Sequence, residues 1–380
     1  MHRNLEDSYT SDKKNFRSAV KCVGWDFLPY LGGYSKTTCH FKNICLTNGT
    51  WYYIKEDGET LPKGIPPMLS TQTGSSFETV PSSNFTFNIT TNEILDRVSG
   101  FDSLAMVFEE YNGVSYGHIL GDEVLPMFRA IKIFDLENFS DTFTPIEVEP
   151  ENPSMYSCLN TKTDYVLRNR DRCIKLRSKV YPLLVNNLPV LASTVSKCFH
   201  NAIIGLGSLT DHCRDETVHG REAKNTTCNH GAGLVFREFY YNIQRRIKKY
   251  PTKNMNEILV VKINRRFSQN MIQVVKAVGS MGLESYNMSL IQVDNIPDSQ
   301  EEQFDMLEGV KVLICPVGSI SFLSVFLRPG ATVILLYELE PLDHNLFSHF
   351  GHIRVIYIQT YDLQEAKLSL QHSIKTSVLF

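Results

Sequence analysis

The sequence predicts an α/β fold built from two domains. Near the C-terminus, three apolar runs rich in β-branched residues alternate with segments in which apolar residues recur at helical spacing. Each run is apolar on both faces, which is typical of strands in a parallel sheet that helices cover on both sides. A chain of 380 residues is also longer than one hydrophobic core usually supports, so two domains are expected.

The C-terminal domain is predicted to alternate strands with helices. The first expected strand covers residues 257–263, and a helix over residues 271–281 follows it. Pro329 and Gly330 end a later helix, since neither residue continues one. Beyond the first helix we expect a weak strand, a short acidic helix, a second strong strand, a third helix and a third strong strand, in that order, at residues 288–293, 299–307, 310–315, 320–327 and 331–337.

The carboxyl ends of two of these strands carry residues suited to an anionic ligand. Arg265, Arg266 and Asn270 follow the first strand, and Gly318 and Ser319 form a turn after the second strong strand. Parallel sheets bind ligands at this edge, near helix N-termini that attract anions. Arginine also matches the geometry of phosphate in bidentate fashion. The C-terminal domain is therefore predicted to hold an anionic ligand, in particular a nucleotide.

The N-terminal half is predicted to be less regular. An Asn-Gly pair lies between two short runs of strand-forming residues and predicts a hairpin over residues 39–54. Residues 135–175 are polar and are predicted to be irregular. We expect further strands at residues 104–108 and 202–206, and helices over residues 117–131 and 235–250.

The helix over residues 235–250 is expected to bridge the two domains. We therefore place the N-terminal domain at residues 1–245 and the C-terminal domain at residues 246–380.

His118 and Asp122 are the candidate catalytic residues of the N-terminal domain. They lie four residues apart on a predicted helix, so both side chains emerge on one face. A carboxylate beside an imidazole orients the ring and raises its basicity, which the removal of a proton from an acceptor hydroxyl requires. The alternative is a His–Asp pair that caps or packs the start of the helix.

Charge and composition exclude some classes of function. With a net charge of −3, the chain lacks the excess of positive charge that is typical of proteins that bind nucleic acid. A metal is not expected, because the His and Cys spacings fit no standard zinc site and no Asp-x-Asp triplet is present to hold a nucleotide-bound cation. The basic run at residues 245–249 is interpreted as a complement to a helix dipole.

The cysteines predict disulfides in the N-terminal half. Eight of the nine cysteines lie in the first 230 residues, and none forms a Cys-x-x-Cys pair. This distribution is typical of disulfides that tie down an irregular, extracellular type of fold. Cys315 lies in a predicted buried strand and is expected to stay unpaired.

Sequons for N-glycosylation also favour a lumenal or secreted setting. They occur at Asn48, Asn84, Asn88, Asn138, Asn225 and Asn287. The first residues are nevertheless polar, and no run of about 20 apolar residues exists anywhere in the sequence. We therefore expect a signal or anchor segment to be missing from this chain; the alternative is an intracellular protein.

Four stretches resemble glycosyltransferase family 61. The segment "YGHILGDEVLP" at residues 116–126 is similar to a motif of that family, and "FLRPGATVI" at residues 326–334 is similar to another. The opening "CHFKNIC" at residues 39–45 and the Arg-Arg-x-x-x-Asn pattern at residues 265–270 agree with the same family. The resemblance covers roughly residues 100–360.

The resemblance implies a fold and an activity. The fold would be of the GT-B type, with two facing Rossmann-like domains. The activity would be inverting, metal-independent transfer from a nucleotide sugar, most simply a UDP-sugar, to a hydroxyl of a protein-linked or polysaccharide glycan. His118, supported by Asp122, would be the general base. The nucleotide would be held by Arg265, Arg266, Asn270, Gly318 and Ser319.

The family also implies a setting and partners. It resides in the secretory pathway, so the expected location is the lumen of the Golgi or the endoplasmic reticulum. The partners would be the nucleotide-sugar donor and a glycan or glycoprotein acceptor. No nucleic acid is expected, and contact with a membrane would require an anchor that this chain does not contain.

The sequence departs from the family near the nucleotide. Val317 stands where the family usually has a histidine, and Leu335 stands where it often has a glutamate, with Glu338 three residues later. A catalytically inactive member that binds glycans or proteins is therefore one alternative. An unrelated intracellular Rossmann-type enzyme is the other, and it would have free thiols and no glycans.

Overall fold

The computed structural model describes most of the chain as two compact units. The described residues up to Leu206 belong to the first unit, and those from Ala232 onwards belong to the second. The predicted boundary at residue 245 falls inside helix α5 (Ala232–Ile247), all of which lies in the second unit. The structure describes residues 16–23, 38–55, 87–108, 110, 113–148, 158, 164–206, 232–262, 267–338 and 351–379.

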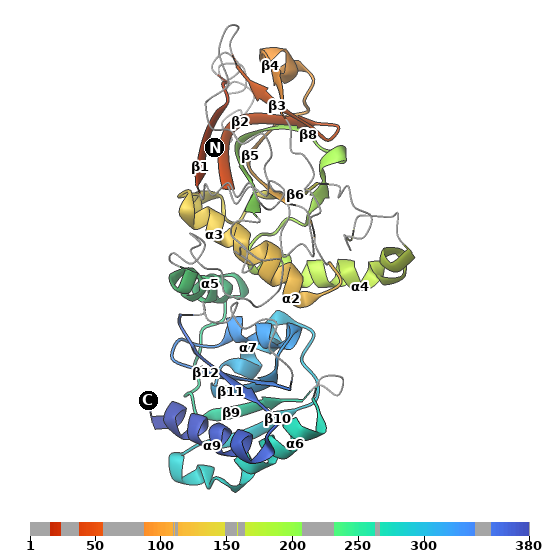
Figure 1. Cartoon of the computed structure of the whole chain (residues 1–380). Helices are drawn as coiled ribbons and strands as arrows, with labels where there is room; N and C mark the ends of the chain where they lie inside the picture. The colour runs from red at the N-terminus through yellow and green to blue at the C-terminus, as the bar shows by residue number, and fades with distance from the viewer. Residues whose placement is uncertain are drawn as a thin grey trace, which may run out of the picture. The chain divides into compact units, whose positions relative to one another are not determined.

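The first unit is built on an 8-stranded mixed sheet (Figure 1). Its main strand order is β4-β3-β2-β8-β5-β6-β7, and β1 pairs with β2 outside this path. Strands β8, β5, β6 and β7 run parallel to one another, and β3 is parallel to β4, whereas β2 is antiparallel to β1, β3 and β8. The strands are β1 (Ala19–Val23), β2 (Thr38–Thr47), β3 (Thr50–Ile54), β4 (Phe87–Thr90), β5 (Phe101–Phe108), β6 (Thr144–Glu147), β7 (Val190–Leu191) and β8 (Ser196–Ile204).

The hairpin predicted over residues 39–54 is confirmed. Strands β2 and β3 pair in register up to Thr47 and Thr50, and the turn between them is Asn48-Gly49. Both turn residues have positive φ, 49° and 77°. This conformation matches the twist of the strands and suits asparagine and glycine.

Helices connect the parallel strands of the first unit. The helix predicted over residues 117–131 is confirmed, but its middle is a π-helix, Ile119–Val124, between α2 (Tyr116–His118) and α3 (Leu125–Ile133). The prediction that residues 135–175 are irregular is wrong, because α4 (Asp164–Val180) begins there. Few residues of α4 are buried, so its sequence carries only a weak apolar stripe.

Two described disulfides tie this unit together, and they agree with the predicted pattern. Cys45 of β2 is bonded to Cys198 of β8, and Cys158 is bonded to Cys173 of α4. Cys39 is also disulfide-bonded. Such bonds form and persist in oxidising compartments.

The second unit is a parallel, doubly wound α/β domain. Its five strands lie in the order β10-β9-β11-β12-β13, and every pair is parallel. Numbered along the chain within this unit, the order is 2-1-3-4-5, one of the two common doubly wound arrangements. The strands are β9 (Glu257–Val261), β10 (Ser289–Val293), β11 (Val310–Pro316), β12 (Thr332–Tyr337) and β13 (Arg354–Gln359).

Helices cover the sheet of the second unit. Apolar residues of α6 (Gln269–Lys276) and α9 (Leu363–Leu379) pack in one core with alternate residues of the strands, so these two helices share a face, as Figure 1 shows. Cys315 of β11 is buried and free, as predicted. The remaining elements are α7 (Gln300–Leu307) and the 3₁₀ helices η9 (Ala277–Ser280), η10 (Leu283–Tyr286) and η11 (Ser319–Phe326).

The predicted α/β fold is therefore confirmed at the level of class. Six of the elements expected between residues 257 and 337 occur within a few residues of their predicted bounds, and the seventh, at residues 320–327, is a 3₁₀ helix. In the parts of the chain that the structure describes, no helix is long and apolar enough to cross a membrane.

His352 is expected to make the stability of the second unit depend on pH. The residue is only 7% exposed, and its ring stacks on that of Tyr240 at a centroid distance of 6.1 Å. Burial disfavours the charged imidazole and lowers the pKa to about 4, from an ordinary value of 6.5; the charge of Arg237 acts in the same direction. Between pH 4 and pH 6.5 the histidine is therefore largely protonated in the unfolded chain and largely neutral in the native one.

We expect the free energy of unfolding of the second unit to fall by about 2 kcal/mol between pH 7 and pH 5 on account of His352. Urea unfolding at the two pH values measures this, and His352→Gln should remove that part of the slope. His372 is exposed on α9, so His372→Gln is the matched control and should leave the slope unchanged. An equal slope in the wild type and in His352→Gln would contradict the assignment.

Candidate functional site

The carboxyl edge of the second sheet contains a reversal of strand order. The chain passes from β9 to β10 on one side of β9, and then returns to β11 on the other side. In open parallel sheets, ligands bind in the crevice at such a reversal, outside the carboxyl ends of the two strands. The segments that follow β9 and β11 are therefore the first place to look for a site.

Gly318 shapes the turn after β11. Its φ of 114° and ψ of −163° belong to a region that only glycine adopts without strain. The carbonyl of Gly318 accepts hydrogen bonds from the backbone N–H of Ser321, at 2.8 Å, and from its hydroxyl, at 2.5 Å. The backbone N–H of Val317 donates to the carbonyl of Leu336 on β12. The turn is thus fixed to the sheet, and the exposed Ser319 begins η11 directly after it.

Asn270 is the second residue of α6 and is half-buried. The helix begins at Ser268, whose hydroxyl accepts a hydrogen bond from the N–H of Met271 at 3.2 Å. Asn270 follows β9 while Gly318 and Ser319 follow β11, so these three residues come after the carboxyl ends of neighbouring strands. Arg265 and Arg266 lie outside the described residues.

His118 lies at the junction of two kinds of helix in the first unit. It is the last residue of α2, it is half-buried, and the π-helix starts with the next residue. Asp122 lies within the π-helix; its side chain is outside the described part of the structure. π-Helical turns inside α-helices are rare and occur frequently at functional sites. The π-helical backbone and the sequence motif therefore indicate a functional role for the same segment.

A buried group of charged side chains lies beside this segment, and the sequence did not predict it. Arg177 of α4 donates to Glu110, from Nε at 3.0 Å and from Nη2 at 2.5 Å, and to Glu147 from Nη2 at 2.5 Å. Glu147 is the last residue of β6, and Glu110 comes two residues after β5. Both carboxyl groups are completely buried. We call these three residues the Glu–Arg cluster.

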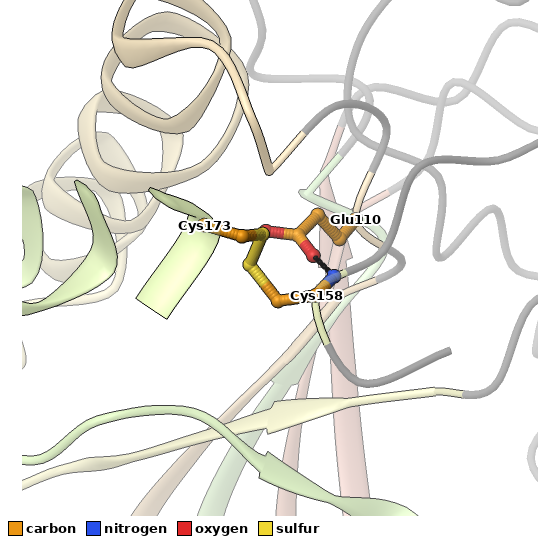
Figure 2. Close-up of side chains that lie close together, drawn as sticks. All are labelled: Glu110, Cys158 and Cys173. Atoms are coloured by element: carbon orange, nitrogen blue, oxygen red, sulfur yellow. Dashed lines mark hydrogen bonds between the residues drawn. A yellow bond between two sulfur atoms is a disulfide. The ribbon is translucent and has the colours of Figure 1, made fainter. Parts of the chain in front are cut away.

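A disulfide borders the Glu–Arg cluster. Figure 2 shows the carboxyl group of Glu110 against the bonded sulfurs of Cys158 and Cys173. The backbone N–H of Cys158 donates to Glu110 Oε2 at 2.5 Å. The side chains of Glu110, Cys158 and Cys173 are close enough to share a metal ion. Because the two sulfurs are joined to each other, however, they offer no thiolate ligands, and the arrangement is better suited to a structural role.

Glu123 extends the buried network into the π-helix. The hydroxyl of Tyr181, directly after α4, donates to Glu123 Oε2 at 2.6 Å. Burial is the main cause that raises the pKa of Glu110 to about 7 and that of Glu123 well above its ordinary value, and the negative charge of Glu147 adds to both shifts. Arg177 therefore binds two buried carboxyl groups, and Tyr181 binds a third one close by.

Four of the six sequons lie within the residues that the structure describes. Asn48, Asn88, Asn138 and Asn287 are all exposed, as an acceptor of a glycan must be. Asn84 and Asn225 lie outside the described residues. Glycosylation at these positions stays a prediction.

The comparisons with known proteins give no family. No protein-family model and no curated protein matches the chain. Among solved structures, a flavodoxin-like domain from Synechococcus is 13% identical and covers 32% of this chain and 94% of its own, with a TM-score of 0.25. A diflavin flavoprotein A3 from Nostoc is 14% identical and covers 33% of this chain and 98% of its own, with a TM-score of 0.24.

Proposed function

We propose that the protein is a glycosyltransferase. It transfers a sugar from a nucleotide sugar, taken to be a UDP-sugar, to a hydroxyl of a protein-linked or polysaccharide glycan. Transfer inverts the anomeric centre and uses no metal ion or other cofactor. The observation that carries the proposal is the turn at Gly318, which occupies the reversal of strand order in a doubly wound sheet. Sheets of this kind bind nucleotides at that point.

The second unit would hold the donor. Arg265, Arg266 and Asn270 would contact the diphosphate, and the backbone at Gly318 and Ser319 would approach it closely at the start of η11. The charge on the diphosphate grows as the bond to the sugar breaks, so groups that stabilise this charge accelerate the reaction. Arginine is suited to this role because its planar fork donates two parallel hydrogen bonds to phosphate.

The first unit would supply the base. His118 would take the proton from the acceptor hydroxyl while Asp122 orients the imidazole. In the proposed arrangement the two units face each other, as in the GT-B type of glycosyltransferase. The disulfides and the exposed sequons support a location in the lumen of the Golgi or the endoplasmic reticulum, and a loss of mass under an N-glycosidase checks this location.

An inactive relative that binds glycans is the second candidate, and two positions favour it. Val317 offers no imidazole beside the turn. Leu335 is completely buried in β12 and offers no carboxylate. Glu338, one residue after β12, is half-buried and is the nearest carboxylate along the chain at that strand end. Binding of a nucleotide sugar separates the two candidates.

We expect one UDP-sugar to raise the thermal stability of the purified protein. A ligand that binds only the native state adds RT ln(1 + [L]/Kd), about 2.7 kcal/mol at a hundredfold excess over Kd. The measurement is the melting temperature with UDP, GDP and a panel of nucleotide sugars. The absence of a shift with every nucleotide, on protein shown to be folded, would favour the inactive relative.

Two glycine variants make this experiment specific for the site. Gly318→Ala should reduce the shift that the nucleotide sugar causes, because a side chain is strained at this φ and the turn must change. Gly330 also has a positive φ, 87°, but it precedes β12 at the opposite edge of the sheet, with open space where a Cβ would lie. Gly330→Ala should therefore lower the melting temperature of the free protein while keeping the shift. Equal shifts in both variants would move the nucleotide away from Gly318.

A further inference from the structure

The segment before His118 is fixed to the Glu–Arg cluster. Glu110 accepts hydrogen bonds from Arg177 and from the backbone of Cys158. Gly113 lies against the same carboxyl group: a Cβ there would come within 2.3 Å of Glu110 Oε1 and 2.7 Å of the sulfur of Cys158. Val114 packs on the disulfide between Cys158 and Cys173. The chain therefore enters α2 from a tightly fitted turn.

The segment after His118 is fixed as well. Glu123 accepts a hydrogen bond from the hydroxyl of Tyr181 at 2.6 Å, and both side chains are completely buried. The ring of Tyr181 also packs near that of Phe108, at the end of β5, with a centroid distance of 6.4 Å. His118 and Asp122 thus lie between two anchored points of the chain.

Both anchors come from one face of one helix. Cys173, Arg177 and Tyr181 are spaced by four residues along α4 and its continuation η5 (Tyr181–Leu183), so their side chains line one side of that helix. Cys173 and Arg177 hold the segment before His118, and Tyr181 holds the segment after it. A single rigid element therefore sets the distance and the rotation between the two anchors.

This arrangement explains why the π-helix persists. If Ile119–Val124 relaxed to an α-helix, the chain beyond it would turn by about 100° and shift by about 1.5 Å relative to the chain before it. Glu123 would then leave Tyr181 unless the turn at Gly113 moved instead. The two anchors in their present positions therefore favour the π-helical backbone.

We infer that the Glu–Arg cluster and the Tyr181–Glu123 hydrogen bond position the π-helical turn that carries His118 and Asp122 for proton transfer. This inference rests on the proposed function, in which His118 is the base. Arg177, Glu123 and Tyr181 are then positioning residues, because they act through the backbone of the turn. Misplacement of a catalytic group by about 1 Å can cost as much as 100-fold in rate.

Tyr181→Phe is the main test, because it removes the hydroxyl that binds Glu123 and keeps the ring. The readout is hydrolysis of the UDP-sugar that stabilises the wild type, in which water takes the place of the acceptor hydroxyl, receives the sugar and releases UDP; kcat and KM are measured separately. We expect kcat to fall by roughly 10- to 100-fold while KM for the donor stays within about twofold. Amide hydrogen exchange of residues 116–124 should become faster. Glu123→Leu, which removes the acceptor, should behave in the same way.

Two further variants separate positioning from stability. Glu123→Gln keeps an oxygen that accepts the hydrogen bond from Tyr181, so it should keep nearly the wild-type kcat. Tyr240 is a buried tyrosine of the second unit whose hydroxyl accepts a hydrogen bond from Gln244 at 2.8 Å. Tyr240→Phe is thus a matched deletion elsewhere and should leave kcat unchanged.

The outcomes distinguish this inference from the proposed function. A wild-type kcat in folded Tyr181→Phe would overturn the inference while leaving the transferase activity established. If the wild type releases no UDP from any donor, the proposed function fails, and hydrogen exchange alone decides the inference. Faster exchange of residues 116–124 in Tyr181→Phe would then uphold the anchoring of the turn, and unchanged exchange would overturn it.

Discussion

Arg177→Met is expected to destabilise the first unit by roughly 3–5 kcal/mol. The guanidinium lies between Glu110 and Glu147, which are both completely buried. Removal of one partner from a buried ion pair leaves the other charge without compensation in a medium of low dielectric constant. Methionine fills a similar volume, so a loss of packing contributes little. The measurement is the midpoint of urea unfolding at constant m-value.

A surface pair of the same unit is the matched control. Lys197 of β8 binds Asp102 of β5 at 3.0 Å, but its side chain is 43% exposed. Lys197→Met also removes one cation, and it should cost no more than about 1 kcal/mol, because solvent screens exposed pairs. Adding Glu110→Gln and Glu147→Gln to Arg177→Met should recover part of the lost stability. Equal, small effects of Arg177→Met and Lys197→Met would contradict the structural role of the Glu–Arg cluster.

The sequence predicted the second unit well, because strands buried on both faces leave continuous apolar runs. It missed β13 and α9, and the reasons are physical. Strand β13 is at the edge of the sheet, and most of its residues are half-buried or exposed. In α9 only a few spaced residues are buried, so its apolar stripe is weak. The strand order puts the carboxyl ends of β9 and β11 together. The local pattern of apolar residues does not predict this order.

In the first unit, local sequence patterns did not predict the π-helical turn or the Glu–Arg cluster. The motif around His118 was visible, and a helix was expected there, but the π-helical turn depends on hydrogen bonds that composition does not reveal. Glu110, Glu147 and Arg177 are charged residues that normally lie at the surface. They are 30 to 67 residues apart along the chain, and only the fold brings them together. The positions of Glu110 and Glu147 at the ends of two neighbouring parallel strands are the one signal that could have suggested a shared site.

His118→Ala is expected to lower kcat for transfer by roughly 100- to 10,000-fold, the usual contribution of a general base. The reason is that an acceptor hydroxyl must lose its proton as the new bond to the sugar forms. Donor binding should not change, because the residues proposed to hold the nucleotide belong to the second unit. The thermal shift that the nucleotide sugar causes therefore serves as the internal check on folding and binding.

His200 provides the control for this variant, since it is an exposed histidine of the same unit, on β8. His200→Ala should retain the wild-type kcat. Asp122→Asn should lie between the two, because the imidazole would keep its place and lose the carboxylate that raises its basicity. It should also move the acidic limb of the pH profile to lower pH, because a less basic imidazole loses its proton at lower pH, and a purely structural role of Asp122 would not do this. Full transfer by His118→Ala would remove this histidine from the mechanism and turn attention to another base.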